Sequence, residues 1–412
     1  MDVTYERCCG LDIHKRTIAA CLIVPDREGK PRKEIRTFGT MTDDLLQLAD
    51  WLASEQVTHV AMEATGVYWQ PIWNLLEGQF ALVLANARHI KAVPGRKTDV
   101  RDSEWIAELL RHGLLKASFV PERSQRELRE LTRYRTSLIQ ERSAEVNRLQ
   151  KTLEGANLKL AAVATDIRGK SGQEILAALV AGRTEPAALA ELAKGKLRAK
   201  LPELERALSG RFGAHQRFLV AQQLAHLDFL DESIERVNAE IAERLRPFEP
   251  AIERLDTIPG VGRRIAEIVL AEVGPDLSRF PTAAHLASWA GMCPGNHESA
   301  GKRKSGRTRK GNGWLRGALT EAGQAAGRTK HTYVGAQYRR LAARRGRKKA
   351  TIAVGHTILI IAYHLLTQNT TYHDLGVDYL EKRNRQAVER RLVRRLEALG
   401  NKVILEPIDP AA

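Results

Sequence analysis

The sequence predicts an α/β domain in the first part of the chain and an all-α remainder. Apolar strand-like runs alternate with amphipathic helical segments up to residue 120. From residue 121 onward, charge-rich helical periodicity replaces that alternation. A length of 412 residues suggests two or three domains, and a hydrophobic share of 43% is enough for real cores.

The elements of the predicted α/β domain follow a definite order. Helical periodicity covers residues 43–54 and 69–76, and a further helix begins near Asp99. The strand-like runs cover residues 8–12, 17–24, 34–40, 58–62 and 81–84. Three strands, a helix, a strand, a helix, a strand and a final helix are the element order of a ribonuclease-H-like domain.

The all-α remainder is expected to contain a long helical arm and a helical C-terminal region. In the arm, apolar residues at alternating spacings of three and four predict a coiled-coil seam about two heptads long. These residues are Leu227, Leu230, Ile234, Val237 and Ile241. An ordinary helix packed on a core explains the same spacing. The predicted domains are residues 1–120 (α/β domain), 121–250 (arm), 251–345 (glycine- and arginine-rich domain) and 346–412 (basic helical tail).

The charge of the chain favours a polyanionic partner. Lys and Arg number 65 against 49 Asp and Glu, which gives a net charge of +16 and a pI near 9.8. The longest apolar stretch, residues 351–366, is short for a membrane span and contains two histidines. No secretory signal and no zinc-like cysteine spacing are visible. We therefore expect a cytoplasmic protein without a membrane role, whose four cysteines are small buried hydrophobes.

Four acidic residues occupy related positions in the predicted α/β domain. Asp12 ends the first strand, Glu63 follows the fourth, and Asp99 and Asp102 lie three residues apart on one helix face. The first and fourth strands are neighbours in such a sheet, so the four carboxylates are expected to converge. Carboxylates this crowded repel one another unless a cation neutralises them, and oxygen ligands select Mg²⁺ or Mn²⁺.

Two such ions about 4 Å apart activate an attacking oxygen and stabilise a leaving one in phosphodiester chemistry. Each acid alone also has a structural explanation. An Asp at the end of a strand is common in turns, and Asp99 after Thr98 can cap a helix. All four acids in the expected order favour a two-metal site.

Residues 257–273 predict a helix-hairpin-helix, in which a PGVG turn joins two helices. Glycines in such a turn let backbone N–H groups approach a phosphate, and the following helix N-terminus adds favourable partial charge. We expect Gly260, Gly262 and Arg263 to contact nucleic acid without reading its sequence. A tight helical turn with no ligand is the alternative.

The segment Asn296–Arg316 is basic and interleaved with glycine. This composition predicts an irregular loop that is too charged to bury without phosphates, and a solvated flexible loop is the alternative. The predicted nucleic-acid ligands are Lys302, Arg303, Lys304, Arg307, Arg309, Lys310 and Arg316. The same segment contains Ser299 and Ser305, and either hydroxyl can attack phosphorus if a metal or a base activates it.

Several motifs resemble the insertion-sequence 110 family of DEDD transposases. They are GLDIHK with Asp12, MEATGVYW with Glu63, and KTDVRDSEWIAELL with Asp99 and Asp102. The later TIPGVG and PGNHESAGKRKSGRTRKGNGWLR are similar to the second conserved domain of that family, in its 1111 subgroup. The resemblance covers roughly residues 8 to 345.

The resemblance implies a RuvC-like domain with a ribonuclease H fold, whose four acids bind the metal, and a second domain with a serine nucleophile. That serine forms a covalent serine–DNA intermediate. Ser299 is favoured as the nucleophile, but Ala300 departs from the family's Ser-Gly-type motif, and Ser305, followed by Gly306, is a rival. The family also implies donor and target DNA and a structured guide RNA from the element's noncoding end. We expect a homo-oligomer, a dimer or a tetramer, because the acids and the serine lie in different domains.

Three functions are therefore considered. The leading hypothesis is a Mg²⁺-dependent transposase that cleaves and rejoins DNA through a serine–DNA intermediate. The second is a RuvC-like nuclease that uses water and needs the acids but not the serine. The third is a non-catalytic nucleic-acid-binding assembly protein with a degenerate ribonuclease H fold.

Overall fold

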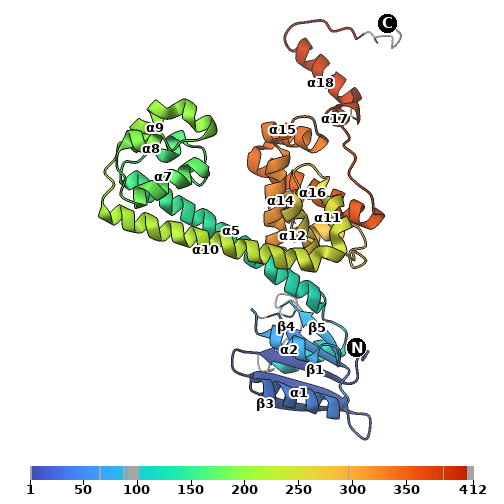
Figure 1. Cartoon of the computed structure of the whole chain (residues 1–412). Helices are drawn as coiled ribbons and strands as arrows, with labels where there is room; N and C mark the ends of the chain where they lie inside the picture. The colour runs from blue at the N-terminus through green and yellow to red at the C-terminus, as the bar shows by residue number, and fades with distance from the viewer. Residues whose placement is uncertain are drawn as a thin grey trace. The chain divides into compact units, whose positions relative to one another are not determined.

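The computed structural model of the chain describes residues 2–64, 66–86, 90, 102–295, 297–383 and 385–405. The chain forms two compact units, Met1–Arg126 and Glu127–Ala412. The first unit is a mixed α/β domain (Figure 1). The second consists mainly of helices and carries a two-stranded hairpin.

The first unit is built on a five-stranded sheet with the strand order β3–β2–β1–β4–β5. β2 pairs in antiparallel fashion with β1 and β3, and β4 pairs in parallel with β1 and β5. The strands are β1 (Cys8–Ile13), β2 (Ile18–Pro25), β3 (Pro31–Phe38), β4 (His59–Glu63) and β5 (Ala81–Ala85). The predicted order of elements is confirmed, and so is the pairing of the first strand with the fourth. The predicted helix start near Asp99 lies outside the described residues, and the helix is described from α4 (Asp102–Arg111) onward.

The two faces of β1 pack against different helices because side chains alternate along a strand. The odd-numbered residues of β1 lie in a core with α1 (Thr42–Ser54) and α2 (Trp69–Leu76). Cys8 belongs to a second core, which contains residues of α4. Gly10 and Asp12 share the face of Cys8 and are therefore on the side of the sheet that α4 covers.

Gly10 lets α4 rest directly on the backbone of β1. A Cβ atom at this position would lie 2.4 Å from the carbonyl oxygen of Ser103 and 2.3 Å from the amide nitrogen of Ala107. Two residues earlier, the Cys8 thiol donates to the Ala107 carbonyl, 3.8 Å away. Gly10, the later residue of β1, reaches an earlier residue of α4 (Ser103) than Cys8 does (Ala107). The helix therefore runs antiparallel to the strand. The start of α4 therefore lies toward the carboxyl end of β1.

The two longest described helices, α5 (Arg123–Gly155) and α10 (Ala214–Leu245), pair in antiparallel fashion (Figure 1). Leu230 and Ile234 of α10 pack against Leu138 of α5. Polar contacts follow the same register: Arg244–Glu127 at 2.9 Å, Asn238–Arg135 at 3.2 Å, Asp231–Arg142 at 2.6 Å and His226–Glu145 at 3.5 Å. The apolar stripe on α10 is thus buried within the chain, without a second copy.

Short helices between α5 and α10 close a small core of their own. They pack on the neighbouring ends of the two long helices through Leu149, Leu153 and Leu227. The elements are α6 (Leu160–Val163), α7 (Lys170–Val180), α8 (Pro186–Ala190), the 3₁₀ helix η1 (Gly195–Lys200) and α9 (Leu201–Leu208). Residues 165–200 thus form short helices.

A larger helical core follows α10. After the 3₁₀ helix η2 (Arg246–Phe248) it comprises α11 (Glu249–Asp256), α12 (Arg263–Val273), α13 (Ala283–Trp289), α14 (Gly313–Ala326), α15 (Tyr333–Arg345) and α16 (Arg347–Gln368). By length and composition alone α16 is apolar enough to cross a membrane. Val354, Ile358 and Leu359 of this helix are buried in the core, which accounts for its apolar sequence. The chain continues into α17 (Tyr379–Arg383) and α18 (Arg385–Glu397).

Replacement of Gly10 by valine is predicted to destabilise the first unit, because α4 must move away from β1 to admit the side chain. The expected loss of unfolding free energy is about 1–3 kcal/mol, as for other overpacked cores. Urea unfolding monitored by circular dichroism measures it. Gly317→Ala is the control, because a Cβ at Gly317 on α14 meets nothing within 4 Å. Equal stabilities of Gly10→Val and the wild type would show that the close approach is not required.

Candidate active site

The carboxylates of Asp12 and Glu63 come from neighbouring strands. β1 and β4 pair in parallel, with Leu11 opposite Met62, and each acid is the next residue of its strand. Matched positions on parallel strands point to the same face and lie roughly 5 Å apart. Both acids are half-buried, and they share the face of the sheet on which α4 packs. Two of the predicted metal ligands are therefore held side by side by the register of the sheet.

Asp102 is brought toward Asp12 and Glu63 by the packing of α4. It is the first residue of α4 and precedes Ser103, whose carbonyl lies against Gly10. Asp12 is two residues beyond Gly10 on the same face, a distance of roughly 7 Å along a strand. Because α4 runs antiparallel to β1, its first turn lies at the end of the strand that carries Asp12. Asp99, the fourth predicted acid, is outside the described residues.

The chemistry of these residues fits a hard divalent cation. Carboxylate oxygens are the ligands that Mg²⁺ and Mn²⁺ prefer. The hydroxyl of Ser103, beside Asp102, is buried and has no hydrogen-bond partner among the described residues, so a polar group is available at this point. Within the described part of the chain, no three His, Cys, Asp or Glu side chains lie close enough together to hold a metal ion. Asp12 instead contacts the exposed His14, with 3.3 Å between Oδ2 and Nε2.

The cysteines near Asp12 are packing groups. Cys8, Cys9 and Cys21 are fully buried in the cores on either side of β1 and β2, as predicted. Burial raises the pKa of the Cys8 and Cys21 thiols to about 12 and raises that of Cys9 well above its usual value. At neutral pH all three are protonated, so they are poor metal ligands.

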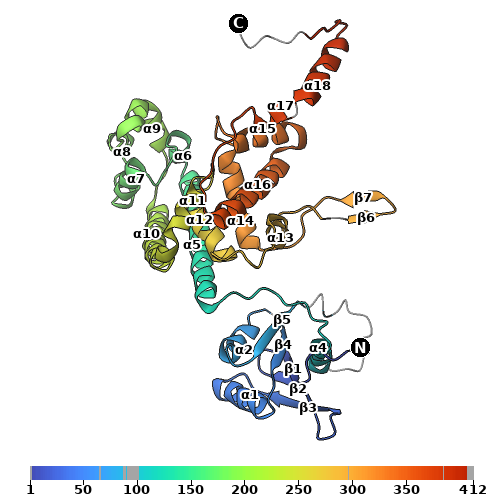
Figure 2. The same cartoon turned by 90° about the vertical axis from the view of Figure 1, so that its right-hand side faces the viewer.

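The predicted serine segment forms a hairpin where an irregular loop was expected. β6 (His297–Ser299) and β7 (Lys302–Ser305) pair in antiparallel fashion and project from the helices of the second unit (Figure 2). Ala300 and Gly301 form the turn, with φ angles of +50° and +71°. Two consecutive residues with positive φ make the turn that joins strands most tightly. Ser299 and Lys302 therefore flank a two-residue hairpin turn. The glycine-rich composition alone did not distinguish this hairpin from an irregular loop.

The two candidate serines occupy different places in this hairpin. Ser299 is the last residue of β6 and lies opposite Lys302, directly before the turn. Ser305 is half-buried at the far end of β7, where its hydroxyl accepts a hydrogen bond of 3.3 Å from the amide of Arg307. The backbone thus carries Ser299 at the tip of the hairpin and Ser305 at its base.

The predicted helix-hairpin-helix consists of α11, a turn at residues 257–262, and α12. Gly260 has a φ of +90°, and a Cβ there would lie 2.5 Å from the Ala322 carbonyl of α14, so the turn packs against the protein. Gly262 is open and precedes α12. Arg263 is paired with Glu249 at 2.5 Å and with Glu267 at 3.0 Å, so acidic partners offset its charge. Of the three residues predicted to contact nucleic acid, only Gly262 is neither packed against the described part of the protein nor paired with acids.

A buried ion network, which the sequence did not predict, holds the base of the basic segment. Glu272 of α12 is fully buried and accepts bonds from Arg133 at 2.7 and 2.8 Å and from the Asn312 amide at 2.6 Å. Arg129 donates to the Ala271 carbonyl at 3.0 Å. Burial lowers the pKa of Arg129 to about 10, which leaves it protonated at neutral pH.

Asn312 also caps α14, because its side-chain oxygen accepts from the amides of Trp314 and Leu315 at 3.1 Å each. Asn312, near the end of the basic segment, is thereby fixed to α5 and α12 through Glu272. Two signals in the sequence pointed to this network. An Asn before an apolar helix is a capping pattern, and Glu267 and Glu272 interrupt an otherwise apolar helix.

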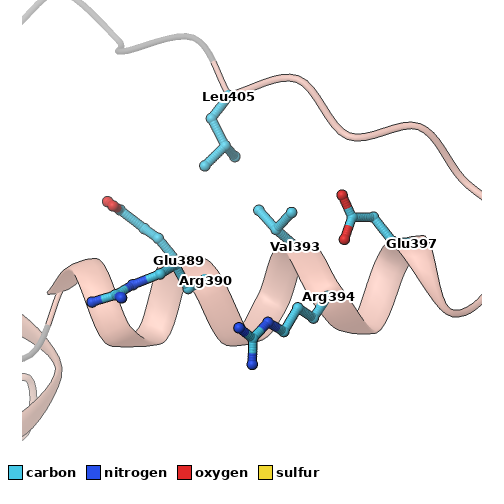
Figure 3. Close-up of a pocket in the computed structure, with 6 residues that line it drawn as sticks. All are labelled: Glu389, Arg390, Val393, Arg394, Glu397 and Leu405. Atoms are coloured by element: carbon cyan, nitrogen blue, oxygen red, sulfur yellow. The ribbon is translucent and has the colours of Figure 1, made fainter.

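A hollow at the C-terminal end of the second unit contains none of the predicted site residues. It lies between α18 and the segment that follows, with Leu405 above Val393 (Figure 3). Glu389, Arg390, Arg394 and Glu397 form its polar rim (Figure 3). Alternating acids and bases of this kind are typical of a solvated helix face.

Comparison with known proteins agrees with the fold. Residues 9–158 match a family model described as a transposase of the DEDD type found in IS110, and residues 252–339 match the model "Transposase IS116/IS110/IS902 family". The DEDD model implies a ribonuclease-H-like fold, which agrees with a mixed five-stranded sheet. The molecule is therefore a transposase. It belongs to the IS110 family, for which DNA substrates and a divalent metal ion are expected.

Bacterial relatives align over about half to nine tenths of the chain. It is 26% identical to the probable family 20 transposase of Pseudomonas aeruginosa, over 79% of this chain and 89% of that protein. It is also 26% identical to the transposase for insertion sequence element IS1111A of Coxiella burnetii, over 88% and 90% of the two chains. A 44.8 kDa protein of insertion element IS116 from Streptomyces clavuligerus is 31% identical over 52% of this chain and 60% of its own.

Replacement of Glu272 by glutamine is predicted to destabilise the second unit by about 3–5 kcal/mol, because it leaves the buried Arg129 and the partly buried Arg133 without their carboxylate. Thermal and urea unfolding measure this loss. Glu321→Gln is the matched control: Glu321 is exposed on α14 and pairs with Arg264, so about 1 kcal/mol or less is expected. A similar small effect of both substitutions would contradict a structural role of the buried network.

Thiol labelling tests the burial of the cysteines. Because a raised pKa keeps a thiol protonated, Cys8, Cys9 and Cys21 are predicted to resist iodoacetamide at pH 8 in the folded protein. The partly exposed Cys293 is predicted to react first. Mass spectrometry of the labelled peptides, with urea-unfolded protein as the reference, gives the order. Rapid labelling of Cys8 or Cys21 in the folded protein would contradict this packing.

Proposed function

We propose that this transposase cleaves and rejoins DNA at a metal site formed by Asp12, Glu63, Asp99 and Asp102, with Ser299 as the nucleophile. The observation that carries the proposal is the packing of α4 on β1 through Gly10, which directs Asp102 toward the paired positions of Asp12 and Glu63. All four acids lie within residues 9–158, which match the DEDD-type family model. One or two Mg²⁺ or Mn²⁺ ions bound there supply Lewis acidity at the transferring phosphate.

The residues of the chain have distinct tasks in this reaction. The acids would hold the metal ion, which in turn binds the phosphodiester. The Ser299 oxygen forms a bond to phosphorus as the bond from phosphorus to the leaving strand breaks, and the serine proton passes to the leaving oxygen. Rejoining is the reverse reaction, with the hydroxyl of a second strand displacing the serine. Each step exchanges one phosphodiester bond for another, so no external energy source is needed.

The hairpin supports the choice of Ser299 over Ser305. A nucleophile must approach phosphorus closely, and Ser299 lies directly beside the turn at the tip of the hairpin. Ser305 is half-buried and engaged with the Arg307 amide. The basic residues predicted to bind phosphate are Lys302, Arg303, Lys304, Arg307, Arg309, Lys310 and Arg316, and they lie on or beside the same hairpin.

The remaining assignments belong to the same proposal. The four segments 1–120, 121–250, 251–345 and 346–412 act as catalytic domain, arm, serine domain and tail. The turn at Gly260 and Gly262 grips a DNA phosphate, and a structured RNA of the element guides the choice of DNA. The acids and the serine lie in different units, which supports a homo-oligomer, a dimer or a tetramer, that acts in the cytoplasm.

A covalent protein–DNA adduct is the predicted signature of this reaction. The full chain is incubated with Mg²⁺, element-junction DNA and RNA transcribed from the flanking noncoding sequence, and denaturing gels detect the adduct. Ser299→Ala and Asp12→Asn are predicted to reduce adduct formation at least about a hundredfold, whereas the control Ser305→Ala retains it.

Other outcomes discriminate among the functions. An adduct lost only in Ser305→Ala would transfer the nucleophile to Ser305. Cleavage without an adduct, insensitive to both serines, would establish a nuclease that uses water. DNA binding without any cleavage by the wild type would leave the non-catalytic assembly function.

A further inference from the structure

The positive charge of the chain is concentrated in one part of the second unit. Residues 299–373 contain sixteen Lys and Arg and a single acid, Glu321. The whole chain has a net charge of +16, so this stretch accounts for nearly all of it. About half of these basic residues belong to the predicted hairpin segment and α14. The others lie later, from Arg328 to Lys349, and have no role in the reaction described above.

Three of these later residues surround a hollow between α14, α15 and α16. Arg328 follows α14, and Arg347 and Lys348 begin α16. The hollow has a volume of about 640 Å³ and is also lined by Tyr338 of α15 and Ile352 of α16. Thr320, Gln324, Gly327 and Thr351 complete its lining, which contains no acidic side chain among the described residues. This hollow is called the α14–α16 groove.

The cations of the groove are not offset by acids among the described residues. On α5, α10 and α12, by contrast, several basic residues pair with acids, as in Arg142–Asp231 and Arg264–Glu321. In the described chain, no acidic side chain forms an ion pair with Arg328, Arg347 or Lys348. Positive side chains in the first turn of a helix are also unfavourable, because they face the positive end of the helix dipole. Their placement lowers stability unless an anion neutralises them.

The groove also offers an aromatic surface. The ring of Tyr338 covers Gly327, where a Cβ would lie 2.7 Å from the ring, and it borders the hollow. Single strands of nucleic acid are bound by basic grooves that follow the backbone and by aromatic rings on which bases stack. Free phosphate needs no such ring. The volume of the groove lies within the range of roughly 300–1,000 Å³ that is usual for ligand sites. It can therefore hold a short portion of a strand.

We propose that the α14–α16 groove binds an unpaired strand of nucleic acid, with phosphates on Arg328, Arg347 and Lys348 and a base against Tyr338. The stripe Arg316–Thr320–Gln324 on α14, at helical spacing, leads from the basic segment toward the groove. The strand is therefore held beside the segment that carries the serine. This inference rests on the proposed function only for the nature of the polyanion, and it does not depend on the identity of the nucleophile.

Binding without Mg²⁺ tests the groove apart from catalysis. Fluorescence anisotropy of the full chain with labelled oligo-dT, oligo-rU and a DNA duplex is measured over a range of KCl concentrations. For the single strands, Arg347→Gln with Lys348→Gln is predicted to lower the slope of log affinity against log salt by roughly 1.4, since each phosphate contact contributes about 0.7. Tyr338→Leu is predicted to weaken single-strand binding roughly five- to hundredfold.

Lys151→Gln with Arg206→Gln is the matched control, because it removes the same charge from exposed positions outside the groove. An equal change of slope in both double variants would overturn the proposal in favour of diffuse attraction. Equal losses on the duplex and the single strands would overturn the assignment to an unpaired strand. The DNA and RNA probes distinguish the two sources of that strand. Thermal unfolding confirms that Tyr338→Leu is folded.

Discussion

The contact between Gly10 and the backbone of α4 is the constraint on which the candidate site depends. Without a side chain at Gly10, the carbonyl of Ser103 lies directly on β1, and the helix is placed by backbone contact. The direction of α4 then brings Asp102 to the end of the strand that carries Asp12. The parallel register of β1 and β4 adds Glu63. Gly10, two residues before Asp12, thus links the packing of α4 on the sheet to the position of the candidate metal ligands at its edge.

A second constraint acts in the other unit. Glu272 is fully buried, and a buried carboxylate is tolerated only when cations and hydrogen-bond donors surround it. Arg133 and Asn312 meet that need, and Asn312 at the same time begins α14. The chain that follows the hairpin is therefore anchored to the helices at Asn312, while the hairpin itself projects from them. An anchored segment with a projecting hairpin is compatible with the proposed role of Ser299.

The sequence predicted the α/β domain well because strand periodicity and helix periodicity differ clearly there. It predicted the order of the elements and the pairing of the strands that carry Asp12 and Glu63. It did not predict the hairpin at Ser299, because Ala300 is an unusual residue for a φ of +50° and glycine-rich segments are compatible with many conformations. It also missed the Glu272 network and the α14–α16 groove. Both depend on residues far apart in the chain, which meet only after the helices have packed.

The proposed metal site requires the acids of the first unit to bind one or two cations together. A crystal of the full chain soaked in Mn²⁺ tests this through an anomalous difference map. A strong peak, or two peaks about 4 Å apart, is expected between the carboxylates of Asp12, Glu63 and Asp102. A map with no peak at these residues, in a crystal that binds Mn²⁺ elsewhere, would mean that the acids do not form a metal site.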